Sequence, residues 1–328
     1  MATMNFDFEA WLNLPTSVLL NEAWRLRRQY FSDRVFFSAP GAKAYENEYY
    51  RNQREDFVTI SLTGNECALD CAHCRKKLLA TMLNCSTPSD LLATVKHLRV
   101  SGCKGVLLSG GANKEGAVPV APFFEAIKEI TSWGVKVIVH TGLAEESTID
   151  GLKEAGVEQV LFDVIGDQET IKEVYHLDKE PQDYLRVLEL CQKYRLPVAP
   201  HIVIGLNYGQ LAGEIEALKM ISLVQPKYVV IVILTPMAGT PMAKVVPPSV
   251  EDCGRLIALA RLTNPSAYLS LGCARPAGYQ RPLLEQYALN AGVNAIAYPS
   301  PDTIGLAREM KLEAEFTSQC CTLFSLDQ

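Results

Sequence analysis

Eight short runs of apolar residues alternate with amphipathic stretches along most of this chain of 328 residues. The runs occupy residues 57–62, 104–109, 135–140, 159–165, 198–204, 228–235, 267–272 and 293–298. Strands that alternate with helices pair in parallel through right-handed crossovers. Eight such units predict an α/β fold, a closed (β/α)8 barrel of the TIM type.

Two further segments flank the predicted barrel. Residues 1–56 form an N-terminal extension whose residues 15–31 have the pattern of an amphipathic helix, which we expect to pack on the barrel or on a partner. The barrel itself spans residues 57–312. Residues 313–328 form a C-terminal tail that contains two adjacent cysteines, and we expect this tail to fold over the barrel mouth. No linker rich in Gly, Ser or Pro divides the chain, so we predict one domain with two extensions.

Composition narrows the class of protein. The formal net charge is −6 and there is no long run of Lys and Arg, which argues against a nucleic-acid partner. No apolar run approaches the length of a membrane span, and the first residues lack a signal pattern. We therefore expect a cytoplasmic protein. Ten cysteines without a secretion signal point to metal or redox chemistry rather than to disulfides.

The most informative motif is a C-x3-C-x2-C loop, Cys67, Cys71 and Cys74, directly after the first apolar run. Closed structural zinc sites and ordinary [4Fe–4S] sites use four protein ligands. Three thiols therefore leave one metal position open for a ligand that is not protein. A zinc site with a distant fourth ligand, or three incidental buried thiols, are the alternatives.

The loop resembles that of the radical S-adenosylmethionine (SAM) superfamily, in which three cysteines hold a [4Fe–4S] cluster. SAM chelates the fourth iron in this family, and an electron from the cluster cleaves it to a 5′-deoxyadenosyl radical. The resemblance implies that His73, just before the third cysteine, lies near the adenine of SAM. It also implies a reductant of the ferredoxin or flavodoxin type as a partner.

Several strand ends resemble the SAM-binding elements of that superfamily. The active site of such a barrel is built at the carboxyl ends of the strands. Ser109, Gly110 and Gly111 end the second run and resemble the Gly-Gly element that binds the SAM amino group. Gly205 on the fifth run resembles a further SAM contact. Asp163, at the end of the fourth run, is a candidate for binding the SAM ribose or the substrate, or for anchoring a neighbouring backbone.

Two histidines and an arginine are candidate catalytic residues. His140 and His201 lie where a substrate or a cluster would sit, although a structural hydrogen-bonding role is the simpler alternative. Arg275 follows Cys273 at the end of the seventh run. A cysteine and an arginine at the barrel mouth are candidates for holding a second iron–sulfur cluster.

The tail supplies further candidate ligands, Cys320 and Cys321. We expect Cys273 and at least one of this pair to hold the second cluster, with a fourth ligand that the sequence does not identify. Adjacent residues rarely both bind one cluster without strain in the chain. One of Cys320 and Cys321 is therefore expected to be a buried or redox thiol.

Nearly the whole chain resembles the biotin synthase and lipoyl synthase branch of the superfamily, and most of all one subunit of the two-protein, archaeal-type lipoyl synthase. This resemblance implies sulfur insertion into an octanoyl chain on a lipoyl-carrier protein, together with a second radical SAM subunit. Ser109, His140 and His201 stand where biotin synthase-like enzymes carry extra cysteines, which argues against dethiobiotin as the substrate. A single-cluster mutase or methylase and a non-catalytic, cluster-carrying subunit are the alternatives.

Overall fold

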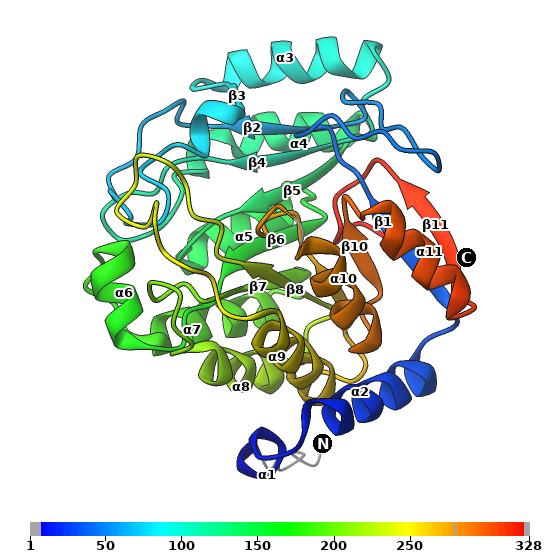
Figure 1. Ribbon diagram of the computed structural model, residues 1–328. Helices are drawn as coiled ribbons and strands as arrows, with labels where there is room; N and C mark the ends of the chain where they lie inside the picture. Colours follow the sequence, from blue (N-terminus) through cyan, green and yellow to red (C-terminus); the bar gives the residue numbers. More distant parts are fainter. Residues whose placement is uncertain (1–7, 279, 325–328) are drawn as a thin grey trace.

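The computed structural model describes residues 8–278 and 280–324, and these residues form one curled parallel sheet with helices around its outer side (Figure 1). The strands are β1 (Arg34–Ser38), β2 (Phe57–Ser61), β3 (Leu83–Asn84), β4 (Gly105–Ser109), β5 (Lys136–His140), β6 (Gln159–Asp163), β7 (Val198–Ile204), β8 (Tyr228–Ile233), β9 (Tyr268–Leu271), β10 (Ala295–Ala297) and β11 (Glu313–Thr317).

The α-helices are α1 (Phe8–Leu12), α2 (Thr16–Tyr30), α3 (Pro88–Val100), α4 (Phe124–Ser132), α5 (Glu146–Glu154), α6 (Gln168–Tyr175), α7 (Pro181–Lys193), α8 (Glu214–Val224), α9 (Val250–Thr263), α10 (Arg281–Asn290) and α11 (Pro301–Glu309). Two short 3₁₀ helices, η1 (Leu79–Thr81) and η2 (Ala121–Phe123), complete the set. None of the helices in this part of the chain is long and apolar enough to cross a membrane.

All eight predicted strands are present, as β2 and β4 to β10. The strand order is β11-β1-β10-β9-β8-β7-β6-β5-β4-β2-β3, and every pairing is parallel. Among the described strands, the edge strands β3 and β11 each have one neighbour and do not pair with each other. The expected closed barrel is therefore a partial barrel.

The N-terminal segment contributes to the sheet as well as packing on it. The helix expected over residues 15–31 is confirmed as α2, which packs against α9 and α10. Strand β1, which the sequence analysis did not predict, pairs with β10 on one side and β11 on the other. Phe36 lies opposite Ala295 and Glu315. The two ends of the chain thus form neighbouring strands (Figure 1).

The sheet separates two apolar cores. Successive side chains of a strand point to opposite faces. In β8, Val229 and Ile231 join the larger core between the sheet and the helices, whereas Val230 and Val232 join a smaller core on the concave inner face. Because both faces are covered, the strands read as continuous apolar runs in the sequence.

The C-terminal tail enters the inner core instead of lying across the barrel mouth. Hydroxyl groups of the barrel wall donate to its carbonyls: Ser38 Oγ to Gln319 O at 2.6 Å, and Ser270 Oγ to Cys321 O at 2.6 Å. The Phe324 ring lies 4.7 Å from the Phe36 ring, centroid to centroid. Phe324 also packs against Tyr228 and Tyr268, the first residues of β8 and β9. The tail therefore runs from the carboxyl edge of the strands toward their amino edge.

Candidate metal centre

The three-cysteine loop is held between the end of β4 and helix α6. Leu62 N donates to Ser109 O at 2.7 Å and Ala68 N donates to Ala112 O at 2.8 Å, which fixes the loop to the segment after β4. Ala72 N donates to Val174 O in α6 at 2.8 Å. Backbone bonds on both sides therefore set the position of the cysteines before any metal binds.

Cys71, His73 and Cys74 bring their ligand atoms within 4.8 Å of one another, and no other group of three His, Cys, Asp or Glu side chains does so in the described part of the chain. A hydrogen bond with Cys71 lowers the pKa of Cys74 to about 4. Burial acts to raise this pKa, and His73 acts to lower it. The same hydrogen bond and burial raise the pKa of Cys71 well above its usual value. The pair therefore shares one proton in the absence of metal.

These residues fit a [4Fe–4S] cluster with one open iron. Thiolates are the ligands that iron–sulfur clusters prefer, and Cys67 lines the same cavity as Cys71 and Cys74. His73 Nδ1 is buried without a hydrogen-bond partner among the described residues. A buried polar atom without a partner is costly, so a ligand that pairs with His73 would stabilise this arrangement.

A cavity of about 150 Å³ lies against the loop and collects residues from four strand ends. Its lining includes seven of the predicted site residues: Cys67, Cys71, His73, Cys74, Gly110, His140 and Asp163. The other predicted residues do not line it: Ser109, Gly111, His201, Gly205, Cys273, Arg275, Cys320 and Cys321.

Asp163 connects the cavity to two further side chains. His140 Nε2 lies 3.9 Å from Asp163 Oδ1, and the Tyr175 hydroxyl donates to Asp163 Oδ2 at 3.0 Å. Burial acts to raise the pKa of Asp163, but the neighbouring His140 holds it below its usual range. The sequence analysis missed Tyr175, whose ring lies 5.2 Å from that of His73. No pattern in the sequence marks it, because it ends α6 like any helix residue.

His201 lies on the inner face of β7, just beyond this cavity. Its ring centroid is 5.9 Å from that of His140. Burial lowers the pKa of His201 to about 4, so the ring is neutral near pH 7. In that state Nδ1 donates to Ala199 O, 2.9 Å away, and Nε2 is left as an acceptor. His201 is thus a neutral acceptor between the cavity and the inner core.

Gly111 has a steric reason to be glycine, and its predicted backbone contact with SAM stays a prediction. A Cβ at Gly111 would lie 2.0 Å from Glu66 O and 2.4 Å from Cys67 Cβ, and its N–H donates to Thr63 Oγ1 at 2.7 Å. The position accommodates the cysteine loop itself, while Gly110 faces the cavity.

Gly205 has no contact with the cavity either. It adopts a positive φ of 77°, and its N–H donates to the buried Glu214 carboxylate at 2.8 Å. A tight turn explains this glycine.

The Gly111→Ala variant is therefore expected to lose most of the iron of this site, because the added Cβ displaces Glu66 and Cys67. Iron analysis and visible absorption after anaerobic reconstitution measure the loss. Gly305→Ala is the matched control, because a Cβ at this helical glycine meets nothing within 4 Å. A full complement of iron in Gly111→Ala would contradict the steric argument.

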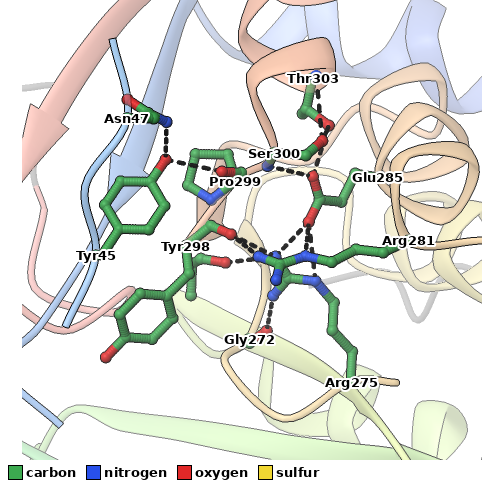
Figure 2. A network of polar contacts seen from close by, with 11 residues as sticks. Tyr45, Asn47, Gly272, Arg275, Arg281, Glu285, Tyr298, Pro299, Ser300 and Thr303 are labelled. Carbon is green, nitrogen blue, oxygen red and sulfur yellow. Dashed lines mark hydrogen bonds and ion pairs between the residues drawn. The ribbon is translucent and has the colours of Figure 1, made fainter. Parts of the chain in front are cut away.

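Arg275, a predicted catalytic residue, is part of a structural network (Figure 2). Its side chain is 2% exposed and donates to Glu285 Oε1 and to the carbonyls of Gly272 and Ala297. These bonds join the ends of β9 and β10 to α10. The guanidinium is engaged by these partners and does not line the cavity at the cysteine loop, and the catalytic role of Arg275 stays a prediction. The sequence could not show that Glu285, ten residues further on, would be its partner.

A second group of thiols forms where the tail enters the barrel. Cys273 is exposed just after β9, Cys320 is half-buried, and Cys321 is buried in the inner core. A hydrogen bond with Cys321, partly opposed by burial, lowers the pKa of Cys320 to about 7. The three cysteines are close, although their sulfurs do not all lie within 4.8 Å of one another.

Comparison with known proteins gives consistent results. A model described as "Radical SAM superfamily" matches residues 61–219. A biotin synthase of Neisseria meningitidis serogroup C is 26% identical over 298 residues, which cover 89% of this chain and 79% of the relative. A biotin synthase of Ruthia magnifica is 23% identical over 308 residues, covering 89% and 86%.

Two solved structures have a similar fold. Methylornithine synthase (PylB) has a TM-score of 0.62 at 18% identity, covering 94% of this chain and 93% of that chain. The hydrogenase maturase HydG from Carboxydothermus hydrogenoformans has a TM-score of 0.63 at 14% identity, covering 94% and 74%. These likenesses support the curled, partial (β/α) barrel.

Proposed function

We propose that this chain is a radical SAM enzyme, as the family model matching residues 61–219 supports, and that it inserts sulfur into a protein-bound octanoyl chain as one subunit of a lipoyl synthase. The cofactors of the family are a [4Fe–4S] cluster and SAM. The observation that carries the proposal is the second group of thiols, Cys273, Cys320 and Cys321. It lies at the same edge of the sheet as the cysteine loop, but β8, β7, β6, β5 and β4 separate its strand, β9, from β2.

At the first site, Cys67, Cys71 and Cys74 would hold the cluster, and Gly110 and Asp163 border the space for SAM. With both bound, the cofactors supply an alkyl radical able to remove hydrogen from an unactivated carbon. The Asp163 carboxylate, fixed by Tyr175, is an acceptor for hydroxyl groups of SAM. His73 offers its unpaired Nδ1 on the same side.

The inner face of the barrel between the two sites suits an alkyl chain. Leu107, Val203 and Leu323 are half-buried apolar residues that pack against the inner core. They would contact the methylenes of an octanoyl group and exclude water from it. His201, neutral at physiological pH, adds no charge to this surface.

The second site would provide the sulfur. Cys273 and Cys320 are the more accessible of its thiols and are the proposed ligands of a second iron–sulfur cluster. Cys321 is buried, its carbonyl accepts a hydrogen bond from Ser270, and its thiol is hydrogen-bonded to the Cys320 sulfur. We assign Cys321 to holding Cys320 in place.

Anaerobic incubation with SAM, a reductant and an octanoylated lipoyl-domain peptide tests the proposal, with and without a second radical SAM subunit. Mass spectrometry should detect sulfur added to the octanoyl chain, together with 5′-deoxyadenosine. A ferredoxin or flavodoxin is the proposed physiological reductant.

A single-cluster enzyme of the mutase or methylase type is the second candidate. It is favoured by the spacing of Cys273, Cys320 and Cys321, whose sulfurs are not gathered as tightly as Cys71 and Cys74. Iron analysis separates the two, since one cluster requires about four irons per chain and two require about eight. Two clusters without SAM cleavage would instead indicate a non-catalytic, cluster-carrying subunit.

A further inference from the structure

A pocket of about 490 Å³ opens at the carboxyl ends of β1, β9 and β10, beside Cys273. Residues from the segment after β1 and from the start of α10 line it, among them Lys43, Tyr45, Arg281 and Tyr298. We call it the Lys43 pocket. Its size is within the usual range for small-ligand sites. It is separate from the cavity at the cysteine loop, with which it shares no lining residue.

Two guanidinium groups at this pocket share one carboxylate. Figure 2 shows Arg275 and Arg281 converging on Glu285, and the Arg281 Nε lies 2.8 Å from Glu285 Oε1. Although burial acts to raise it, the charge of Arg275 and the hydrogen bond of Arg281 hold the pKa of Glu285 below its usual value. The Glu285 side chain is fully buried, whereas that of Arg281 is 30% exposed. The network therefore presents one uncompensated positive charge toward the pocket.

Lys43 adds a second positive charge. It is exposed, its Nζ lies 5.6 Å from the centroid of the Tyr298 ring, and no carboxylate of the described residues is within ion-pair distance of it. The one acidic residue of the lining, Glu46, pairs with Arg51 at 3.6 Å. On a chain with a net charge of −6, this is a local cationic site.

We propose that the Lys43 pocket binds a carboxylate of the peptide that carries the acyl chain. Positive charges beside a partly desolvated pocket select an acidic ligand and fix its register. A carboxylate held here would place the attached acyl chain at the barrel mouth, next to Cys273 and the apolar inner face. The inference rests on the proposed function for the identity of the ligand, while the charge of the pocket does not depend on it.

The test compares two fluorescent peptides that carry an octanoylated lysine, one flanked by Asp and one by Asn. Fluorescence anisotropy measures their affinity for the cluster-loaded protein with SAM and without reductant, so that no turnover occurs. We expect the Asp peptide to bind about fivefold more tightly, with the preference shrinking as salt is added. Lys43→Glu should remove the preference.

Lys311→Glu is the matched control. It makes the same charge change at an exposed position just before β11. This position lies at the amino ends of the strands, away from the Lys43 pocket at their carboxyl ends, so the preference should be unchanged. Equal binding of the two peptides, or a preference that survives in Lys43→Glu, would overturn the proposal. Either result would indicate that the positive charge of the Lys43 pocket serves a cluster at Cys273 instead of a peptide carboxylate.

The two proposals can fail separately. A preference for the Asp peptide without sulfur insertion would reject the proposed function and keep the carboxylate site. Sulfur insertion with no preference for the Asp peptide would support the proposed function and reject the carboxylate site.

Discussion

Replacing Cys67, Cys71 or Cys74 by Ala is expected to abolish the formation of 5′-deoxyadenosine from SAM. Each thiol is one of only three protein ligands, so the loss of one leaves too few to hold a [4Fe–4S] cluster. The fold should persist, because backbone bonds from the segment after β4 and from α6 hold the loop. Anaerobic product analysis and iron counting measure the effect, and the melting temperature reports on the fold.

Cys85→Ala provides the matched control. Cys85 is fully buried, its thiol donates to Thr94 at 3.3 Å, and it does not line the cavity. This variant should retain its iron and its SAM cleavage. A loop variant that kept both a full cluster signal and near-normal product formation would remove that cysteine from the ligand set.

The second large effect is expected from Cys273→Ala and from Cys320→Ala. Each should lose about four irons and sulfur insertion while SAM cleavage persists, because the first site is built from a different part of the sheet. Mössbauer spectroscopy and iron counting distinguish the two clusters. Cys321→Ala is the comparison, since this buried thiol is assigned to positioning and its loss should retain more of the iron.

Unchanged iron content in both Cys273→Ala and Cys320→Ala would eliminate the second cluster. The protein would then be the single-cluster enzyme. Equal losses in Cys320→Ala and Cys321→Ala would instead make both tail cysteines necessary for the site.

The sequence allowed the eight buried strands to be predicted because each is covered on both faces. Tyr228–Ile233, for example, reads as one apolar run. Three strands were missed for physical reasons. β3 has two residues, and β11 alternates acidic and apolar residues as an edge strand does. β1 lies outside the regular alternation of strands and helices, and its strand partners lie more than 250 residues away.

Spacing alone predicted the metal-binding loop, since neighbouring cysteines in one turn must converge. Residues that meet through tertiary packing were harder to predict. Arg275 was placed at the correct strand end, but its direction depends on Glu285, which reaches it from α10. Tyr175 became part of the site only because α6 lies against the cysteine loop. A strand-end rule locates a residue without giving its partner.

The pairing of β1 with β10 and β11 has a consequence for how the chain folds during synthesis. Residues 34–38 leave the ribosome early, but both of their strand partners lie in residues 295–317. Until those residues emerge, Phe36 and Phe37 belong to an unpaired apolar segment, which is prone to incorrect pairing and aggregation. Contacts this distant in sequence also form slowly. The final part of the sheet therefore cannot assemble until residues 295–317 have been translated, and a chain that stops before them would expose this segment.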